Sequence, residues 1–400
     1  MSVDIVFFDN MPMRSHNPEP RIKVRGLMRR GHRVLVVDKM GMNDPSLANI
    51  GLISARLKAL ARRTPASSPP SGWPVTEGIM RPVLLPPRRA PVVKGINRRW
   101  LARSLKHAIE AAGMKDPLLW TRFPAPELVD IIDQLPHRGV LYECVDDYPA
   151  FLHWSDEVRA LLRENERRLT QRADLVVVTA PRLGERLGPW ARRLEVVPNG
   201  VDVELFMGKG VGELPSELAG RLKPPVVGFV GVLDLRLDYE LLVKVARAVK
   251  PGVLLIVGPQ YPKVPIERLP QEPNVVFAGE VPHEQVPLYL RHMDACLLPY
   301  DGSKELVRAL SPVKLFEYLA SGVPVVGVDL PAVRALDDVV RVATTHDEFV
   351  AHVLAAVAEH DPAARQARQD RALTEGWDSR LDSLDASIRE VFPGPGRSAR

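Results

Sequence analysis

A lysine and a glutamate stand near the start of an apolar segment, in the sequence SPVKLFE (residues 311–317). The residue types predict a helix with Ser311 as its N-cap and Pro312 at the first helical position, where the missing N–H costs no hydrogen bond. The first turn of such a helix presents free backbone N–H groups and the positive end of the helix dipole, and both favour a bound diphosphate. Lys314 stands in this turn, where the dipole disfavours a cation unless an anion is bound. Glu317, on the next turn, is suited to accept hydrogen bonds from ribose hydroxyls.

The alternative for this segment is an amphipathic helix that only packs against the strand after it. That alternative explains Leu315 and Phe316, which are apolar. It does not explain the Ser-Pro pair, Lys314 and Glu317 together. We therefore interpret residues 311–317 as a site for a ligand that carries a diphosphate and a ribose.

Two neighbouring aspartates, Asp146 and Asp147, follow the apolar segment VLYEC (140–144). The segment predicts a strand, and α/β proteins bind ligands beyond the carboxyl ends of their strands. A carboxylate in that position can act as the general base that removes a proton from an acceptor hydroxyl. The alternative is that the two acids cap a loop or the helix that follows.

The segment after the first apolar run, DNMPMRSHNPEPR (9–21), contains Arg14, His16 and Arg21. It follows a strand and would therefore line the same edge of the sheet. These side chains are suited to bind an acceptor phosphate. His16 could equally be a loop residue without a chemical role.

Two glycines, Gly228 and Gly231, occur in the apolar segment PVVGFVG (225–231). Glycine is favoured where a backbone approaches a ligand closely. A Gly-x-x-Gly pattern is weak evidence alone, so it supports a binding site only together with the other residues.

Length and composition predict a soluble protein of two domains. Four hundred residues exceed what one hydrophobic core usually serves, and 46% hydrophobic with 26% charged residues is ordinary for a globular protein. The two cysteines lie in apolar runs and indicate no disulfide framework, which fits a reducing compartment. The N-terminus, MSVDIVFFDN, is typical of a first strand and not of a signal peptide, and no apolar stretch approaches the length that spans a bilayer. We therefore expect a cytoplasmic protein.

Strand-like and helix-like segments alternate along the chain, which predicts an α/β fold with two Rossmann-like, doubly wound domains facing each other across a cleft. Strands are expected at 4–8, 33–38, 117–121, 140–144, 174–179, 194–198, 225–231, 252–258, 274–279, 295–300, 324–329 and 339–343. Helices are expected at 22–31, 95–112, 126–135, 155–172, from 181, and at 238–249, 283–292, 312–321, 346–360 and 362–391.

Basic residues crowd the first half of the chain, around the expected helix in 93–112 (VKGINRRWLARSLKHAIEAA). This helix would carry an apolar stripe of Ile96, Trp100, Leu101, Leu105 and Ile109. One interpretation is a solvated basic face above a stripe that faces the core. The other is peripheral contact with an anionic membrane surface, at the inner face of the plasma membrane. Nucleic acid is not expected as a partner, because no groove-reading motif accompanies the charge.

The segment SPVKLFEYLASGVPVVGVD (311–329) resembles the donor-binding signature of GT-B glycosyltransferases, of the family 1/4-like group that includes glycogen-synthase-like and lipid-sugar mannosyltransferase enzymes. Other segments are similar to further parts of that family, more loosely in the first half: 195–206 to its interdomain segment, 226–234 to the first strand and loop of its second domain, 274–300 to its base-binding portion, and 142–151 and 173–181 to its first domain.

The resemblance implies a glycosyltransferase that moves a sugar from a nucleotide-diphosphate sugar to a hydroxyl of a lipid-linked or surface-polysaccharide acceptor. It implies no cofactor and no metal, since these enzymes stabilise the leaving diphosphate with helix amides and cations. An Asp-x-Asp metal site is therefore disfavoured. The segment 142–151 also resembles the strand-end aspartate of bacterial exopolysaccharide glucuronosyltransferases, which implies that Asp146 is the base. Arg236 is implied to reach the diphosphate, with an ion pair to Asp234 or Asp238 as the alternative.

The implied domains are an acceptor-binding domain over 1–205, a nucleotide-sugar-binding domain over 206–375, a C-terminal helix over 376–392 that packs back toward the first domain, and a disordered tail over 393–400. The implied site has Asp146 as its catalytic residue. The implied donor-binding residues are Gly231, Arg236, Ser311, Pro312, Val313, Lys314 and Glu317, and those on the acceptor side are Arg14, His16 and Asp147.

The sequence departs from the family at Ala309, where many retaining members carry a second glutamate; the nearest one here is Glu305. Inverting and retaining chemistry therefore both stay open. One alternative function is a catalytically silent nucleotide-sugar-binding protein, and another is a non-hydrolysing sugar-nucleotide epimerase. The chain lacks the cluster of His, Glu and Asp residues of such epimerases. An exported solute-binding protein is disfavoured because no signal peptide is recognised.

Overall fold

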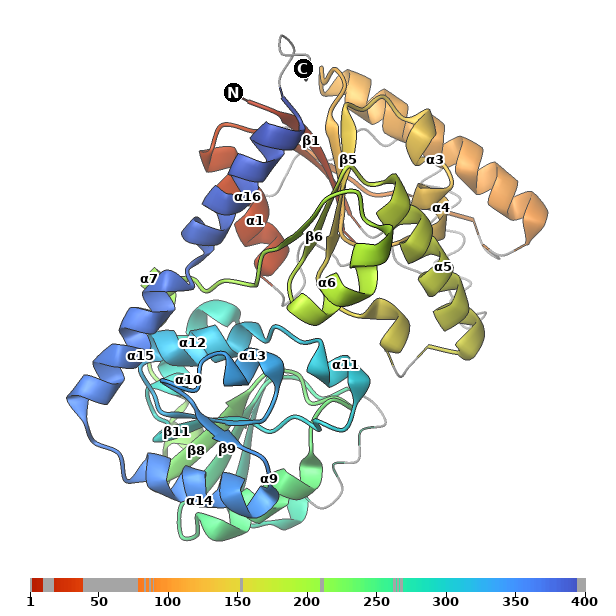
Figure 1. Cartoon of the computed structure of the whole chain (residues 1–400). Helices are drawn as coiled ribbons and strands as arrows, with labels where there is room; N and C mark the ends of the chain where they lie inside the picture. Colours follow the sequence, from red (N-terminus) through yellow and green to blue (C-terminus); the bar gives the residue numbers. More distant parts are fainter. Residues whose placement is uncertain are drawn as a thin grey trace. The chain divides into compact units, whose positions relative to one another are not determined.

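The computed structural model divides the chain into two compact units (Figure 1). The first contains Met1–Val197 and Leu381–Arg400, and the second contains Pro198–Arg380. The structure describes residues 2–9, 18–38, 78–151, 154–208, 212–261 and 269–393, without positions 83, 86, 87 and 89, together with Val264 and Ile266.

The second unit begins at Pro198, a few residues before the boundary expected after residue 205. Val201 and Phe206 account for the difference, because both are buried in the hydrophobic core of the second unit. The segment that joins the two sheets in sequence therefore packs with the second.

The first unit contains a sheet of seven parallel strands. They are β1 (Asp4–Phe8), β2 (Arg33–Val37), β3 (Ile79–Met80), β4 (Leu118–Thr121), β5 (Gly139–Cys144), β6 (Leu175–Val178) and β7 (Leu194–Val196). Their order in the sheet is β3-β2-β1-β4-β5-β6-β7. The strands are continuous apolar runs because helices cover both faces, and Phe7, Trp120 and Tyr142 are fully buried. The order reverses between β1 and β4, the point where doubly wound sheets bind ligands.

Helices cover this sheet on two sides. They are α1 (Glu19–Arg29), α3 (Pro91–Ala111), α4 (Pro126–Val129), α5 (Asp156–Arg172), α6 (Pro181–Leu187) and α16 (Trp377–Val391), with 3-10 turns η2 (Ile132–Gln134), η3 (Tyr148–Ala150) and η4 (Gly188–Trp190). Figure 1 shows α1 and α16 on one face of the sheet and α3, α4 and α5 on the other. The helix expected over 126–135 is broken, since α4 ends at Val129.

The stripe expected on α3 does not form one face. Leu101, Leu105 and Ile109 are buried, whereas Ile96 and Trp100 are 48% and 41% exposed. The two groups differ in exposure because Ile96 and Trp100 each precede a buried residue by one position. One position along a helix corresponds to a rotation of about 100°, so their side chains point away from the buried row. The exposed row is extended by Val92, and the exposed side chains of Arg99, Arg103 and Lys106 continue the same face.

The second unit contains a sheet of six parallel strands in the order β10-β9-β8-β11-β12-β13. These are β8 (Val226–Val230), β9 (Val253–Val257), β10 (Val275–Gly279), β11 (Ala295–Leu298), β12 (Val325–Val328) and β13 (Arg341–Ala343). The order reverses between β8 and β11, as in a dinucleotide-binding Rossmann sheet. The two doubly wound parallel sheets confirm the predicted fold class.

Helices also cover both faces of this second sheet. They are α7 (Val203–Met207), α8 (Ser216–Ala219), α9 (Tyr239–Ala248), α10 (Val286–Leu290), α11 (Glu305–Arg308), α12 (Val313–Ser321), α13 (Pro331–Arg334), α14 (His346–Val357) and α15 (Pro362–Thr374), with η5 (Leu269–Gln271) and η6 (His283–Gln285). Helices α10 and α12 lie on one face and α9 and α14 on the other (Figure 1). The helix expected over 283–292 is a 3-10 turn followed by the short α10, which carries Pro287 in its first turn.

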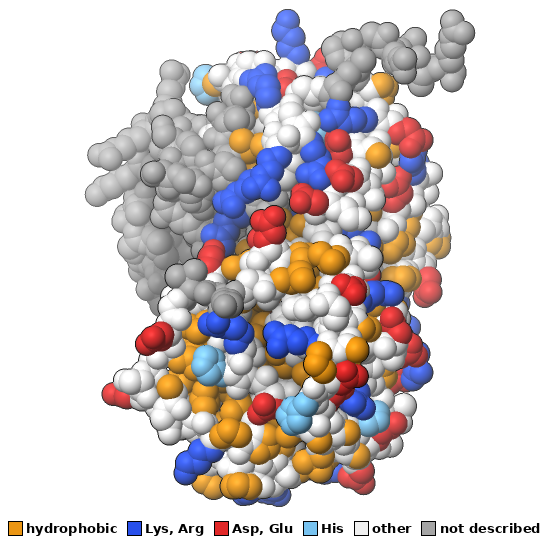
Figure 2. Space-filling model, turned by 90° about the vertical axis from the view of Figure 1, so that its left-hand side faces the viewer, with side chains coloured by type: hydrophobic (Ala, Val, Ile, Leu, Met, Phe, Trp, Pro, Cys, Tyr) orange, Lys and Arg blue, Asp and Glu red, His pale blue; other side chains and the backbone are white. Residues whose placement is uncertain are grey.

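Helix α16 packs against α1 in the first unit, from Leu381 onward. A Cβ on Gly26 of α1 would collide with the side chain of Leu381, so glycine permits the close approach of the two helices. The return of the C-terminal helix to the first domain is therefore confirmed. Figure 2 looks onto the side that carries α1 and α16, where basic side chains gather in a row with acidic side chains beside them.

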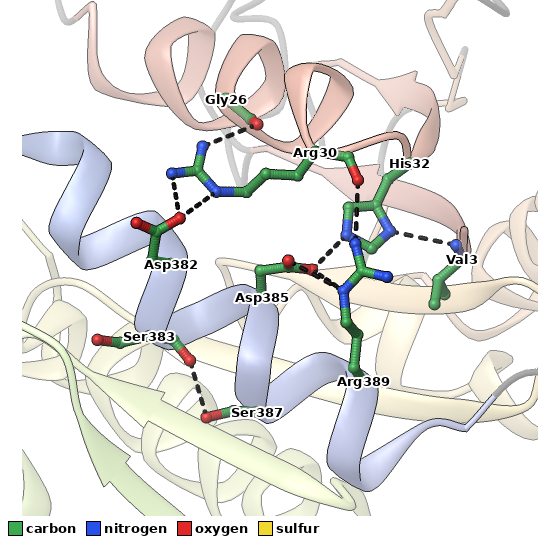
Figure 3. A network of polar contacts seen from close by, with 9 residues as sticks. All are labelled: Val3, Gly26, Arg30, His32, Asp382, Ser383, Asp385, Ser387 and Arg389. Carbon is green, nitrogen blue, oxygen red and sulfur yellow. Dashed lines mark hydrogen bonds and ion pairs between the residues drawn. The ribbon is translucent and has the colours of Figure 1, made fainter. Parts of the chain in front are cut away.

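A polar network joins the two helices to the start of the sheet (Figure 3). The buried ring of His32 accepts a hydrogen bond at Nδ1 from the N–H of Val3 (3.2 Å), so its Nε2–H donates to Asp385 (2.6 Å). Arg389 donates to the same carboxylate at 2.8 Å. Burial raises the pKa of Asp385, but the hydrogen bonds from Arg389 and His32 outweigh it and lower the pKa below its ordinary value.

None of the described helices combines the length and the hydropathy that a membrane-spanning helix requires.

Replacing Asp385 by Ala should lower the free energy of unfolding by about 1–3 kcal/mol, because His32 and Arg389 lose a charged partner. The depressed pKa of Asp385 sets the pH dependence: its contribution is present above the unfolded carboxyl pKa and is lost as the pH falls through the folded value. Chemical denaturation at pH 7 and pH 3 measures both effects. Asp382→Ala is the comparison within the same network, because the carboxylate of Asp382 binds Arg30 but is 73% exposed and should contribute little. Equal destabilisation by both variants would contradict this role of the network.

Candidate functional site

Gly231 directly follows β8 at the reversal point of the second sheet, and its backbone lies against Lys314 of α12. Its φ of +145° lies in the region that favours glycine. A Cβ at this position would stand 2.8 Å from Cε of Lys314. The structure thus brings together Gly231 and Lys314, two residues that the sequence placed in one site. Gly228, by contrast, lies inside β8, where a Cβ would be 3.1 Å from the carbonyl oxygen of Leu255.

Helix α12 begins one residue later than expected and carries no side-chain cap. Pro312 is the N-cap residue, with φ −72° and ψ 113°, and no side chain caps the first turn. The expectation that Ser311 is the N-cap is therefore wrong, because an extended Pro312 separates Ser311 from the helix. The carbonyl of Ser311 instead accepts a hydrogen bond from the side-chain amide of Asn199 (2.8 Å). In the first turn, the N–H of Leu315 bonds the carbonyl of Pro312 (3.0 Å), and the N–H groups of Val313 and Lys314 are the ones suited to a bound anion.

The ammonium group of Lys314 lies over two aromatic rings. Its Nζ is 4.7 Å from the ring centre of Phe229 and 5.5 Å from that of Tyr300. The side chain is half-buried, and within the described part of the chain its described interactions are these cation–π contacts, with no carboxylate in an ion pair. Aromatic faces stabilise a cation without neutralising it. The arrangement is therefore suited to an anionic ligand.

Glu317 lies one turn further along α12, and its carboxylate is buried to about nine-tenths. Its Oε1 is 2.7 Å from Nε2 of His283. Next to it on the helix, the buried hydroxyl of Tyr318 accepts a hydrogen bond from the N–H of Val230 at 2.8 Å, which fixes α12 to the end of β8. Sequence reasoning placed His283 only at the start of a helix.

Arg236 lies in the loop after β8 and pairs with Asp234. Its Nε and Nη2 donate to Oδ2 of Asp234 at 2.8 and 2.5 Å. This is the ion pair weighed as the alternative for Arg236. Lys304, which follows β11, contacts this loop. It donates to the carbonyl of Leu235 (2.6 Å) and pairs with Asp301 (2.8 Å).

In the first unit, Asp146 and Asp147 follow β5 as expected. The backbone carbonyl of Asp146 accepts a hydrogen bond from the N–H of Tyr148 (3.0 Å). Asp147 occupies the N-cap position of η3 without forming a side-chain cap there, and α5 is capped by Ser155, which accepts from Val158. Neither acid is therefore the side-chain cap of η3 or of α5, and the alternative that they cap a loop stays open.

Asp147 lies close to Arg186 of α6. Its guanidinium lies 3.6 Å from Asp147 and also binds Glu166, which accepts a hydrogen bond from Tyr142 (2.9 Å). Asp147 is thus tied to an arginine that the sequence did not single out.

A buried ionic cluster fills the reversal point of the first sheet. It consists of Asp9, Glu19, Lys23, Arg122 and Glu143, all of them 5% exposed or less. Arg122 contacts Asp9 (3.2 Å), Glu19 (2.5 Å) and Glu143 (3.2 Å). Burial raises the pKa of Glu19, but Arg122 and Lys23 outweigh it and lower the value to about 2. For Asp9, Arg122 and Glu143 the sequence signal was a charged residue directly after, or inside, an apolar strand, whereas Glu19 and Lys23 stand on α1.

Of the residues expected to bind an acceptor phosphate, Arg14 and His16 lie outside the described part of the chain, and Arg21 lies half-buried in α1.

Comparison with known proteins bears on the second unit most directly. Residues 224–359 match the family model of the glycosyl transferases group 1. This part of the chain is therefore similar to a group 1 glycosyl transferase domain, and it is called the group 1 domain below. It contains Gly231, Lys314, Glu317 and His283, so the residues gathered around α12 all lie within the group 1 domain.

A relative from Bacillus subtilis (strain 168), assigned to teichuronic acid biosynthesis as the glycosyltransferase TuaH, is 31% identical over 225 residues. The match covers 54% of this chain and 56% of the relative, so the chain spans about half the length of the curated relative that it matches.

Two solved structures are similar over nearly the whole chain. Sucrose-phosphate synthase from Thermosynechococcus elongatus has a TM-score of 0.71 at 19% identity, covering 98% of this chain and 99% of its own. HepE from Anabaena, in complex with UDP-glucose, has a TM-score of 0.62 at 14% identity, covering 97% and 99%. At these identities the likeness shows the fold, which is the GT-B fold of two Rossmann-like units.

Replacing Lys314 by Met should weaken the binding of a nucleoside diphosphate about 10- to 100-fold, because one charge-assisted contact to the diphosphate is lost. Methionine keeps the packing against Phe229, so the fold should be retained. Isothermal titration with UDP, GDP and ADP measures the effect. Lys244→Met, on a half-exposed lysine of α9, is the control. Unchanged affinity in Lys314→Met would rule out this lysine as the diphosphate ligand.

Proposed function

We propose that the protein is a glycosyltransferase that uses a nucleotide-diphosphate sugar as donor. One observation carries this proposal: the half-buried ammonium of Lys314 stands at the uncapped start of α12, beside Gly231, with no carboxylate paired to it in the described chain. A cation and free N–H groups at a helix start suit the diphosphate of such a donor. The group 1 domain and the fold shared with HepE, which was crystallised with UDP-glucose, support the same conclusion.

The transfer forms a bond from an acceptor hydroxyl oxygen to the anomeric carbon, and the bond from that carbon to the diphosphate breaks. The proton of the hydroxyl passes to the carboxylate of Asp146. The negative charge that develops on the leaving diphosphate is stabilised by Lys314 and by the N–H groups of Val313 and Lys314. With these groups in place the step proceeds without a metal. We propose this route as an inverting one.

We propose a lipid-linked or surface-polysaccharide acceptor. The relative from Bacillus subtilis, assigned to teichuronic acid biosynthesis, supports this acceptor class.

Ala309 favours a second candidate function, a nucleotide-sugar-binding protein without transferase activity. Its buried methyl group stands where many retaining members have a glutamate. Release of a labelled sugar from UDP- or GDP-sugars, or its transfer to lipid extract, distinguishes the two functions.

Asp146→Asn should lower kcat by at least about 100-fold, because a general base contributes roughly 10²–10⁴ to the rate. Nucleotide affinity should stay unchanged, since Asp146 belongs to the other unit. The assay is transfer of labelled sugar from UDP- or GDP-sugars to lipid extract. Asp133→Asn, on a carboxylate that is 68% exposed, serves as the control. Near-normal transfer by Asp146→Asn would show that another group takes the proton.

We propose further that the exposed face of α3 binds the anionic inner surface of the plasma membrane. Val92, Ile96 and Trp100 would enter the lipid interface, and Arg99 and Arg103 would bind its headgroups. Two other basic residues of this helix, Lys94 and Arg98, are already paired with Asp130.

Ile96→Ser combined with Trp100→Ser should reduce flotation with liposomes of three parts phosphatidylcholine to one part phosphatidylglycerol by about tenfold or more, since each buried apolar side chain contributes on the order of 1.5–3 kcal/mol. Wild-type protein should bind pure phosphatidylcholine weakly. Leu373→Ser, which removes a 55% exposed leucine from α15, is the control. Equal flotation of the double variant and the wild type would exclude α3 as the membrane contact.

A further inference from the structure

His283 and Glu317 form a partly buried pair beside the start of α12. The ring nitrogen Nε2 of His283 is 2.7 Å from Oε1 of Glu317, and the two side chains are only 15% and 10% exposed. His283 belongs to η6 and Glu317 to α12, so the contact joins two elements that are distant in sequence. The pair lies within the group 1 domain, yet the transfer described above gives it no role: it uses Asp146, Lys314 and the start of α12.

The ring of His283 is fixed from a second side. Phe206 of α7 packs against it edge-on, with ring centres 5.3 Å apart and an interplanar angle of 62°. Asp202 caps α7 by accepting a hydrogen bond from the N–H of Leu205 (3.1 Å), and its negative charge also acts on the histidine. The histidine therefore has a defined orientation, and its Nε2–H points at the carboxylate.

A carboxylate buried to this degree requires hydrogen-bond donors, because an unpaired buried charge is costly. In the described chain, Oε1 of Glu317 takes its hydrogen bond from His283. A carboxylate offers about four lone-pair sites, so Oε2 remains available for hydroxyl groups. The histidine thus fixes the plane of the carboxylate and leaves one of its oxygens for a ligand.

We propose that His283 is a positioning residue for the nucleotide donor: it holds Glu317 in the orientation that accepts the ribose hydroxyls. This inference rests on the proposed function, because it takes a ribonucleotide as the ligand of the site. His283 does not touch the reacting atoms. Its effect is expected in the recognition of the ribose and not of the diphosphate.

The charges around His283 add a pH dependence. Burial lowers the pKa of His283, but the hydrogen bond that the ring donates to Glu317 and the charges of Glu317, Glu284 and Asp202 outweigh it, so the pKa is raised. The charged pair is therefore complete at low pH and loses its attraction as the pH rises through the folded pKa. A neutral imidazole still donates one hydrogen bond, so the loss of ribose recognition at alkaline pH should be partial.

The test compares UDP, GDP and ADP with their 2′,3′-dideoxy forms by isothermal titration on the full chain. His283→Phe keeps the ring against Phe206 and removes the N–H donor. It should weaken the ribonucleotide about tenfold, as loss of a hydrogen bond to a charged group implies, and leave the dideoxynucleotide unchanged. His283→Gln restores a donor and should recover most of the affinity. His292→Gln, an exposed histidine of the same region, is the control.

Two results, in each case with a wild type that binds, would overturn this inference and leave the proposed function standing. In the first, His283→Phe binds the ribose and the dideoxyribose nucleotides more weakly by the same factor; in the second, its affinity for both is unchanged. If no diphosphate binds the wild type, the proposed function fails and this inference fails with it. If the variant does not fold, a measurement on the wild-type protein still tests the inference. The preference of the wild type for ribose over dideoxyribose should decrease between pH 6 and pH 9, and a constant preference would contradict the proposal.

Discussion

The half-buried positive charge of Lys314 is the feature on which the rest of the site depends. A cation near a helix start opposes the helix dipole, and the aromatic rings of Phe229 and Tyr300 compensate for this only in part. The close approach of the lysine requires a glycine at position 231, and the hydroxyl of Tyr318 fixes the helix to the strand before that glycine. These contacts position the charge and leave it unneutralised in the described chain. A diphosphate would supply the missing negative charge.

In the first unit, by contrast, the buried charged side chains are paired with one another. At the reversal point of its sheet, Arg122 and Lys23 are surrounded by the carboxylates of Asp9, Glu19 and Glu143, and these groups are buried. Because the cluster is internally paired, it is suited to hold the strand ends that carry the acids after β5 and not to bind an anion itself. The contrast supports the proposed donor binding in the second unit, where Lys314 has no carboxylate partner among the described residues.

Local chemistry explains why much of this could be predicted from the sequence. Apolar runs marked the strands, and the residues around Lys314 marked a helix start at a strand end, so the fold class and the meeting of Gly231 with Lys314 were accessible. Contacts between elements that are distant in sequence could not be predicted in this way. His283 and Glu317 are 34 residues apart, and Arg186 reaches Glu166 over 20, so neither contact leaves a pattern in the sequence. Contacts with distant elements also decided the outcome at α3, where the expected apolar stripe is divided into a buried row and an exposed row. They decided it at Ser311 too, whose carbonyl accepts a hydrogen bond from Asn199.

A crystal structure with a bound nucleoside diphosphate, chosen from UDP, GDP and ADP, tests the central claim most directly. The account predicts diphosphate oxygens within hydrogen-bond distance of Nζ of Lys314 and of the first N–H groups of α12, with the ribose hydroxyls on Glu317. A nucleotide bound elsewhere, or a diphosphate that contacts neither Lys314 nor the start of α12, would contradict it.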